Sequence, residues 1–428
     1  MFLLTVMVIR GFSEGSRCYL TLSEAKGYSF PCKTLPTQLW SRPPSPHSMP
    51  AVTIDLKKSE DLRDVVHRAV EALSAGKILA LPTETVYGLA VSALHPGAVE
   101  RLSAFKNRTP EKPFSVAVRG FEESLDYIPD MSQLGRRFAQ RCWPGPVTLV
   151  LDGSHRDSVL NRLSPDVRRA VVSNGTVGLR VPAHELTLQI LRLCAGPIIL
   201  TSANEQGTPP ATDGSSIAAD LGAGVDVVLD DGPTHFAAPS SVVQVTDDQF
   251  KILREGVVNQ AAMQRVSGFC ALIVCTGNTC RSPMAEGILR ELLSERLNCN
   301  ADEIDQRGAT VMSAGISAGA GGAAATPAIE VMSQSGIDLR THSSQPLTPQ
   351  LINFSDVILT MTNGHRAAIV NRWPHLEKKT FTVRRDNGDI SDPIGGPVEL
   401  YRQCAEQIRE NLVQWVEAFN HQLPTRES

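Results

Sequence analysis

The stretch from Ala271 to Ser282 reads Ala-Leu-Ile-Val-Cys-Thr-Gly-Asn-Thr-Cys-Arg-Ser, and it decides how the second half of the chain folds. Its first four residues are a short, branched apolar run that predicts a buried strand. Pro283 follows and predicts the first turn of a helix. A strand that passes through a tight loop into a helix presents free backbone N–H groups and the positive end of the helix dipole to one point. The pattern therefore predicts an anion cradle at the end of a strand.

The residue types in this loop point to phosphate chemistry. Cys275 opens the loop and Arg281 closes it, with five residues between them. Positive surroundings favour the thiolate form of cysteine, which is its nucleophilic form. A lone cysteine at a strand end is more often a buried structural residue, but the Cys-x5-Arg-Ser spacing at a strand–helix junction reverses that preference. Cys275 is therefore predicted to attack a phosphorylated substrate.

Length and composition describe an ordinary globular protein. The chain of 428 residues is long enough for two or three domains. Its 42% hydrophobic and 20% charged residues are typical of such proteins, and its net charge of −4 argues against a protein that coats nucleic acid. Nine scattered cysteines indicate a reducing compartment, so we expect a cytoplasmic protein without a disulfide framework. No apolar run approaches the roughly 20 residues of a membrane span.

The first 50 residues match the rest of the chain poorly. Residues 1–9 are apolar but have no basic residue before them, which makes a weak signal peptide. Residues 40–46 read Trp-Ser-Arg-Pro-Pro-Ser-Pro, which is typical of a disordered linker. Met49 directly precedes the first well-patterned segment. We therefore expect residues 1–50 to be a non-functional extension, disordered or upstream of the true start.

Residues 51–258 are predicted to form a first globular unit. Apolar residues at helical spacing predict a helix over residues 59–75, capped by Ser59 and ended by Gly76, and a buried strand follows over residues 77–81. Short apolar strands then alternate with polar or Gly/Pro turns. In chain order, these turn segments are Pro82–Leu89, Lys106–Pro113, Trp143–Thr148, Gly178–Pro182, Leu200–Asn204, Pro239–Val243 and Ile252–Gly256. Each is a weak signal alone, and the cationic Lys106–Pro113 loop, although suited to phosphates, is by itself more often a plain surface loop.

Taken in order, these segments resemble the YrdC-like threonylcarbamoyl-adenylate synthases over nearly the whole unit. The resemblance implies a twisted α/β sheet with a positive groove. It also implies formation of threonylcarbamoyl-AMP from L-threonine, bicarbonate and ATP, with release of pyrophosphate, for modification of the adenosine beside the anticodon of certain tRNAs. By the same resemblance, the expected ATP-binding residues are Lys106, Arg108, Lys112, Ser202, Asn204 and Arg254, and the expected threonine-binding residues are Thr85, Arg180 and Ser240.

The expected chemistry of this unit needs positioning and charge stabilisation and no covalent nucleophile. Mg²⁺ is expected to accompany ATP, because it usually bridges the phosphates, but the sequence identifies no protein ligands for it and no other metal site. Ala117 stands where many relatives carry a histidine. That departure bears on the affinity for threonine.

Residues 268–424 are predicted to form a second unit, joined to the first by a short helical connector over residues 259–267. Strands are expected at residues 271–274, near 310–312, at 357–361 and near 381. Helices are expected at residues 283–297, near 328–335 and at 398–419, where apolar residues recur at helical spacing. This alternation implies a parallel sheet with helices on both faces, and a ligand at the carboxyl end of the first strand.

The second unit resembles the low-molecular-weight protein tyrosine phosphatase family along its full length. The resemblance rests on the Cys-x5-Arg-Ser loop, on Ser313-Ala314-Gly315 and on Asp392-Pro393. It implies that Cys275 attacks phosphorus, that Arg281 and the loop amides hold the phosphate oxygens, and that Asp392 protonates the leaving group and then activates water, without a cofactor. The remaining loop residues are expected to support the phosphate: Thr276, Gly277, Asn278, Thr279, Cys280 and Ser282. The resemblance further implies a reversible disulfide between Cys280 and Cys275.

The substrate of the second unit is open between three classes. Thr279 stands where tyrosine-specific members carry an aliphatic residue, and it resembles the bacterial protein-arginine phosphatases. Residues 394–396, Ile-Gly-Gly, lack the tyrosine that those members have after Asp-Pro. Phosphoarginine is therefore the first expectation and phosphotyrosine the second. Arsenate reduction is a third, for which resolving thiols beyond Cys280 are not evident.

The whole chain is thus expected to be a bifunctional α/β enzyme. Its expected partners are ATP, L-threonine, bicarbonate, a phosphoprotein substrate and the tRNA-modification machinery, with tRNA itself as a candidate, and no membrane. Two alternatives stay open: the first unit only binds double-stranded RNA, or the second is an inactive anchoring domain. ATP consumption that requires threonine would reject the first alternative, and activity lost in Cys275→Ser would reject the second.

Overall fold

The computed structural model describes residues 51–109, 111–419 and 423, so the predicted extension over residues 1–50 lies outside the described residues. The described residues of both predicted units belong to one compact unit of the chain. Among them, no helix is long enough and apolar enough to cross a membrane.

The strands of the first unit are β1 (Val52–Asp55), β2 (Leu79–Leu81), β3 (Gly88–Ser92), β4 (Ser115–Ala117), β5 (Val147–Asp152), β6 (Val172–Ser173), β7 (Thr176–Arg180), β8 (Ile198–Ser202), β9 (Val227–Asp230), β10 (Ser241–Thr246) and β11 (Gln249–Arg254). Its helices are α1 (Leu62–Ser74), α2 (Pro96–Phe105), α3 (Phe121–Tyr127), α4 (Gln133–Cys142), α5 (Pro165–Val171), α6 (Glu185–Leu193) and α7 (Ile217–Leu221). Helix α8 (Gln260–Ser267) lies in the predicted connector.

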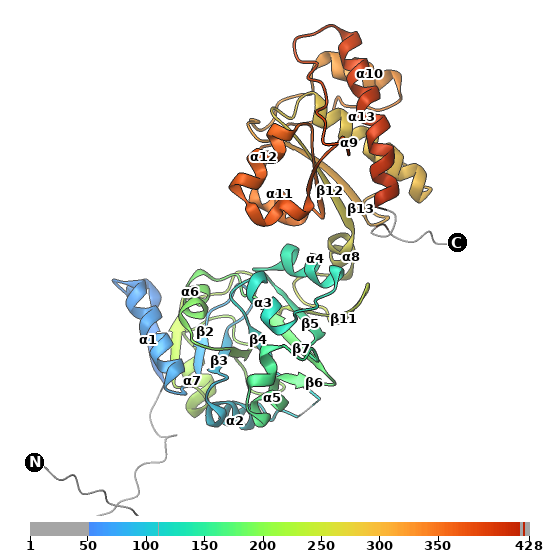
Figure 1. Ribbon diagram of the computed structural model, residues 1–428. Helices are drawn as coiled ribbons and strands as arrows, with labels where there is room; N and C mark the ends of the chain where they lie inside the picture. The colour runs from blue at the N-terminus through green and yellow to red at the C-terminus, as the bar shows by residue number, and fades with distance from the viewer. Residues whose placement is uncertain (1–50, 110, 420–422, 424–428) are drawn as a thin grey trace, which may run out of the picture. The chain divides into compact units, whose positions relative to one another are not determined.

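These strands form one mixed sheet in the order β1-β9-β2-β3-β8-β4-β7-β5-β10-β11, with β6 beside β7. Helices cover both faces, because successive residues of a buried strand point to opposite sides. In β2, Leu79 and Leu81 join the apolar cluster of α1 and α6, whereas Ala80 joins the larger cluster that includes α2 to α5. The predicted twisted α/β sheet is therefore confirmed for the first unit (Figure 1).

The first helix begins later than the sequence predicted. Asp61, and not Ser59, caps α1, because its carboxylate accepts a hydrogen bond from Arg63 N at 2.9 Å. The Ser59 hydroxyl instead donates to the Asp55 carbonyl at 3.0 Å. The predicted end is confirmed, since Gly76 follows α1 with a φ of +74°, in the left-handed region that favours glycine.

The strands of the second unit are β12 (Phe269–Cys275), β13 (Ala309–Gly315), β14 (Val357–Thr360) and β15 (Thr380–Thr382). Its helices are α9 (Arg281–Leu297), α10 (Thr326–Gln334), α11 (Pro349–Phe354), α12 (Asn363–Arg372) and α13 (Val398–Ala418). Short 3₁₀ helices in the two units are η1 (Leu56–Lys58), η2 (Val159–Arg162), η3 (Gly222–Gly224) and η4 (Pro374–Lys379).

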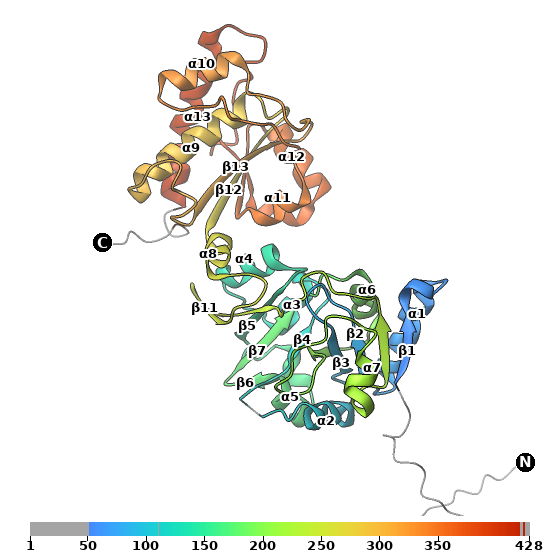
Figure 2. The same cartoon turned by 180° about the vertical axis from the view of Figure 1, so that it is seen from behind.

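The second sheet has the order β13-β12-β14-β15, and all its neighbouring strands pair in parallel. Its central strand β12 is buried along its whole length: Ala271 and Ile273 join the cluster of α9, α10 and α13, and Leu272 and Val274 join that of α11 and α12. Figures 1 and 2 show these two sets of helices on opposite sides of the sheet. The predicted parallel sheet in three layers is therefore confirmed, with Cys275 at the carboxyl end of its central strand.

Candidate active sites

The Cys275 loop joins the end of β12 to the start of α9, as predicted. Backbone hydrogen bonds from the segments after β13 fix it: Ile316 N donates to Cys275 O at 3.0 Å and Ala325 N to Thr279 O at 2.8 Å. Within the loop, Asn278 has a φ of +54°, a left-handed conformation that asparagine tolerates better than most residues. The turn at Asn278 lets the chain wrap around the thiol before the helix begins.

The Cys275 thiol is held by polar partners although it is only 3% exposed. Asn278 N donates to its sulfur at 3.1 Å, and the Ser282 hydroxyl lies 3.0 Å away. Both partners lie at or beside the positive end of α9. A helix N-terminus of this kind also attracts an anion such as phosphate toward the sulfur. The local geometry therefore suits a nucleophilic cysteine.

The Asn278 side chain connects the loop to the rest of the sheet. Its amide nitrogen donates to Ser282 Oγ at 2.9 Å and to Ser313 Oγ at 2.8 Å, and its amide oxygen accepts from Gln345 N at 2.9 Å. The Ser313 hydroxyl in turn donates to Glu286 at 2.6 Å. Burial raises the pKa of the Glu286 carboxyl. The loop is thereby fixed by groups on α9, β13 and the segment after it.

Arg281 and Asp392 form an ion pair at the mouth of the loop. The Arg281 guanidinium is buried, with 6% of its side chain exposed, whereas the Asp392 side chain is 44% exposed. Ile394 N donates to the other Asp392 oxygen at 3.2 Å. The structure thus brings the two predicted catalytic groups together from residues 111 positions apart in the sequence. Asp392 is open enough to exchange a proton with a substrate or with water.

Two histidines that the sequence reasoning missed also contact this loop. His342 Nε2 lies 2.8 Å from the Asn278 carbonyl, and His365 Nε2 lies 2.8 Å from Thr276 Oγ1. The other ring nitrogen of His365 lies 3.0 Å from Thr362 Oγ1. Burial, and then the charge of Arg281, lower the pKa of His365. No local pattern identified either residue, because each reaches the loop from a distant segment.

The predicted partner of Cys275 in a disulfide, Cys280, is a free thiol here, as Cys275 is. Cys280 directly precedes α9, and its sulfur lies 3.8 Å from the Tyr401 hydroxyl on α13. The disulfide therefore stays a prediction.

The first unit contains a second candidate site, a cavity of about 650 Å³. Of the residues predicted to bind ATP or threonine, those that line it are Arg108, Arg180, Ser202, Asn204, Ser240 and Arg254. The first and last of these residues, Arg108 and Arg254, are 146 positions apart in the sequence, and the folding of the sheet brings them to one cavity. Thr85 and Lys106 lie behind this lining, and Lys112 is exposed outside it.

The three arginines of the cavity repel one another. Burial, and then the charge of Arg254, lower the pKa of Arg108, and burial followed by the charge of Arg180 lowers the pKa of Arg254. Arg108 donates to Thr201 Oγ1 at 2.9 Å and stacks over the Phe114 ring, with 4.7 Å to the ring centroid. Its buried Nε has no hydrogen-bond partner within the described part of the chain. An anion in this cavity would relieve the repulsion.

Arg180 is oriented by a residue that was not predicted as part of the site, Glu84. One Glu84 oxygen accepts from Arg180 Nη2 at 2.7 Å, and the other accepts from Ala183 N at 2.7 Å. The same Arg180 nitrogen also lies 2.7 Å from Thr85 Oγ1, so the two residues predicted to bind threonine are in contact. Glu84 lies inside the Pro-Thr-Glu-Thr segment, whose polar residues between two apolar runs were the available signal.

Lys106 is directed at the loop after β8. Its ammonium donates to Asn204 O and Asn204 Oδ1 at 2.7 Å each, and to Ser202 O at 3.2 Å. Burial, and then the charge of Arg108, lower the pKa of Lys106 to about 8. Lys106 therefore fixes the loop that carries Ser202 and Asn204, and its predicted contact with phosphate stays a prediction.

Ala117 lies next to this site, because β4 pairs it with Arg180 of β7. It is 4% exposed and packs in the apolar cluster of α1 and α6. The position at which the sequence departs from the expected histidine is therefore adjacent to Arg180 and apolar in this chain.

Comparison with known proteins places each unit in a family. Residues 71–256 match the Sua5–YciO–YrdC family model, which is described as Telomere recombination, and residues 271–425 match the model of the low molecular weight phosphotyrosine protein phosphatases. The chain is 33% identical to a threonylcarbamoyl-AMP synthase of Pyrococcus abyssi over 45% of its own length. It spans only about half of that relative, 54%.

Two further relatives are covered nearly end to end. A Mycobacterium tuberculosis protein, provisionally named a threonylcarbamoyl-AMP synthase, is 32% identical over 50% of this chain and 95% of its own length. A protein-arginine-phosphatase of Bacillus subtilis is 36% identical over 33% of this chain and 91% of its own length. The chain therefore belongs to the threonylcarbamoyl-AMP synthase family through its first unit and to the low-molecular-weight protein phosphatase family through its second.

Proposed function

We propose that the first unit makes threonylcarbamoyl-AMP from L-threonine, bicarbonate and ATP, releasing pyrophosphate, and so supplies the tRNA-modification machinery. The observation that carries this proposal is the convergence of Arg108, Arg180 and Arg254 on one cavity. Such a cluster suits the phosphates of ATP together with the carboxylate of an amino acid. Because activation of a carboxyl group at phosphorus is mainly positioning and charge stabilisation, the cavity needs no nucleophile.

The Mg²⁺ that we expect belongs to the ATP substrate. Within the described ranges, no group of three or more His, Cys, Asp or Glu residues is arranged to hold a metal ion. Glu111 lines the cavity, but it is a single carboxylate. Magnesium commonly retains water and binds mainly through phosphates, so a protein cage is not required.

The test of the first activity is pyrophosphate release by the full chain with ATP, Mg²⁺, threonine and bicarbonate, each omitted in turn. Release should require all four, and Arg108→Ala should reduce it by about 10²-fold or more, the usual loss when one charge-stabilising donor is removed. The matched control is Arg63→Ala, since the Arg63 side chain is 85% exposed on α1. A protein that binds ATP but releases no pyrophosphate would favour the alternative of a module that binds double-stranded RNA, and release that does not require threonine would refute the substrate assignment.

We propose that the second unit hydrolyses protein phosphoarginine, with phosphotyrosine as the second candidate. In the first step, the Cys275 thiolate forms a bond to phosphorus while the P–N bond breaks, and Asp392 gives its proton to the leaving nitrogen. In the second step, Asp392 takes a proton from water, whose oxygen attacks phosphorus and breaks the P–S bond. The product is inorganic phosphate, and the thiolate is restored.

The resting contacts support these roles. Asn278 N and the Ser282 hydroxyl hold the Cys275 sulfur, and Asp392 is half-exposed beside Arg281. When phosphate binds, Arg281 would turn its free donors to the phosphate oxygens. The residue after Asp392-Pro393 is Ile394, which is 71% exposed and offers no aromatic wall for a tyrosine ring. Together with the similarity to a protein-arginine-phosphatase, this favours phosphoarginine.

The second activity is tested with matched peptides that carry phosphoarginine or phosphotyrosine. We expect a higher kcat/KM for phosphoarginine, no activity in Cys275→Ser and a strong loss in Asp392→Asn. Thr279→Ile should shift the preference toward phosphotyrosine. Activity that survives Cys275→Ser would refute the mechanism, and a phosphotyrosine preference in the unaltered chain would refute the substrate assignment. We further propose that the protein acts in the cytoplasm, where both substrates would be found.

A further inference from the structure

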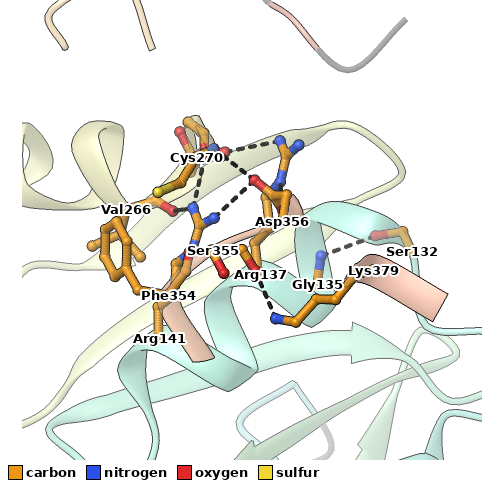
Figure 3. A network of polar contacts seen from close by, with 12 residues as sticks. Ser132, Gly135, Arg137, Arg141, Val266, Cys270, Phe354, Ser355, Asp356 and Lys379 are labelled. Carbon is orange, nitrogen blue, oxygen red and sulfur yellow. Dashed lines mark hydrogen bonds and ion pairs between the residues drawn. The ribbon is translucent and has the colours of Figure 1, made fainter. Parts of the chain in front are cut away.

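The two catalytic units meet at a buried ionic network that neither active site uses. Arg137 and Arg141 lie one turn apart on α4 of the first unit, and both reach the same carboxylate, that of Asp356 in the second unit (Figure 3). Arg137 Nε lies 2.7 Å from one Asp356 oxygen, and Arg141 Nη2 lies 2.9 Å from the other. We call Arg137, Arg141, Phe354 and Asp356 the docking cluster.

All three guanidinium nitrogens of Arg141 have hydrogen-bond partners. Its Nη1 donates to Val266 O and Gly268 O at 2.6 Å each, and its Nε donates to Phe354 O at 2.7 Å. Its guanidinium also stacks over the Phe354 ring, with 4.5 Å to the ring centroid. The Arg141 side chain, which comes from α4, thus binds both the end of α8 and the turn between α11 and β14.

Burial separates this network from ordinary surface pairs. The side chains of Arg141, Asp356 and Arg137 are 1%, 8% and 12% exposed. The ion pair between Arg340 and Asp338 has 76% and 50% of its side chains exposed, so water screens it. A buried charge that loses its partner is strongly destabilising, whereas an exposed one is not. Replacing one partner of the docking cluster while the others stay buried should therefore cost more stability than neutralising one partner of an exposed pair.

The docking cluster is also connected to the strand that carries the nucleophile. Asp356 Oδ2 accepts from Cys270 N at 2.8 Å, and Asp356 N donates to Cys270 O at 2.8 Å. Cys270 lies at the start of β12, and Cys275 is the last residue of that strand. Lys379 supports the same turn by donating to Ile352 O at 2.8 Å and Ser355 O at 2.7 Å (Figure 3).

We propose that the docking cluster joins the synthase and phosphatase units into one body that unfolds cooperatively, with Asp356 as the carboxylate shared by both. This coupling goes beyond the two proposed activities, and only its second test rests on the proposed binding of ATP to the first unit. One physical consequence is that a ligand bound to one unit protects the other against unfolding, because mass action then acts on the shared transition.

The first test is calorimetry of the full chain and of two charge-neutralised variants. The unaltered chain should unfold in one transition. Asp356→Asn should lower the midpoint and split the transition in two, and it should expose the connector over residues 259–267 to protease. Asp338→Asn, which neutralises an exposed partner, should do neither. Two separate transitions in the unaltered chain, or an Asp356→Asn variant that matches Asp338→Asn, would overturn the proposal.

The second test uses ligand linkage and Arg141→Met, which removes the guanidinium but keeps an unbranched apolar stem. The phosphatase activity that remains after heating is measured with p-nitrophenyl phosphate, with and without ATP present during heating. ATP should slow the loss of this activity in the unaltered chain and in Asp338→Asn. This protection should disappear in Arg141→Met. If ATP protects Arg141→Met as well as it protects the unaltered chain, the docking cluster is not the coupling element. If Asp356→Asn fails to fold, Arg141→Met carries both tests.

Discussion

Removing the Glu84 carboxylate should destabilise the end of the first cavity at which we propose that threonine binds. Glu84 and Arg180 have 7% and 9% of their side chains exposed and are 2.7 Å apart. In Glu84→Ala, Arg180 keeps only Thr85 Oγ1 as a hydrogen-bond partner within the described part of the chain, and Ala183 N loses its acceptor. Breaking a buried pair costs about 3–5 kcal/mol. Because Arg180 also lines a cavity that water can enter, we expect the lower end, about 3 kcal/mol, or roughly 10²-fold in the folding equilibrium.

Urea unfolding with an unchanged m-value measures this loss directly. The control is Glu185→Ala, because Glu185 is 71% exposed and 3.8 Å from Arg192, a surface pair worth at most about 1 kcal/mol. Glu84→Gln should fall between the two, since an amide oxygen can still accept one of the two hydrogen bonds. All three proteins should then be assayed for pyrophosphate release, where Glu84→Gln should raise the KM for threonine. A loss in Glu84→Ala no larger than in Glu185→Ala would refute the view that Glu84 holds a buried charge.

Three other predictions concern single side chains at the two sites. Burial lowers the pKa of Lys106 to about 8, and ATP phosphates would restore its proton, so ATP affinity should be constant below pH 8 and fall above it. Titration calorimetry in two buffers that differ in ionisation enthalpy should detect the proton taken up when ATP binds. Lys106→Gln should abolish this uptake. Uptake that persists in Lys106→Gln would contradict the assignment of the proton to Lys106. Asn278→Ala removes three hydrogen bonds from the loop that follows Cys275, and it should lower kcat of the phosphatase by about 10²-fold. The control is Asn298→Ala, because Asn298 has the same φ of +54° at the far end of α9, and this change should leave kcat unchanged. Burial lowers the pKa of His365 from 6.5, so below pH 6.5 the unfolded chain binds more protons than the folded protein, whose stability should fall there. Urea unfolding at several pH values measures how the free energy of unfolding depends on pH. His365→Asn should weaken that dependence, and an unchanged dependence would refute the reasoning.

The phosphate loop could be predicted from sequence because its signals are local. The apolar run of β12, the spacing from Cys275 to Arg281 and the proline at the start of α9 lie within a few residues of one another. Backbone dihedral angles and helix capping respond to exactly such near neighbours. The helix start at Asp61 was missed for a related reason, since Ser59 and Asp61 are both good capping residues two positions apart and only the observed hydrogen bonds distinguish them.

The first cavity was predicted only in part. Ordered motifs identified Arg108, Arg180 and Arg254, but they did not reveal that Lys106 supports a loop or that Lys112 lies outside the lining. The direction of a long cationic side chain depends on which carbonyl groups the fold brings near it. Such acceptors are distant in the sequence, as in the pair of Lys106 and Asn204.

From the sequence alone, two units of α/β type and a candidate nucleophile, Cys275, could be predicted, because strand, turn and helix signals act over short stretches. Only the tertiary structure decided which distant groups meet: Glu84 with Arg180, His365 with Thr276, and Arg141 with Asp356, which are 96, 89 and 215 positions apart. In the sequence, Arg137 and Arg141 are two charged residues of one helix, with no sign of burial. Their partner emerges only when packing removes that helix face from water, since a buried charge then requires an opposite charge that the local sequence does not contain.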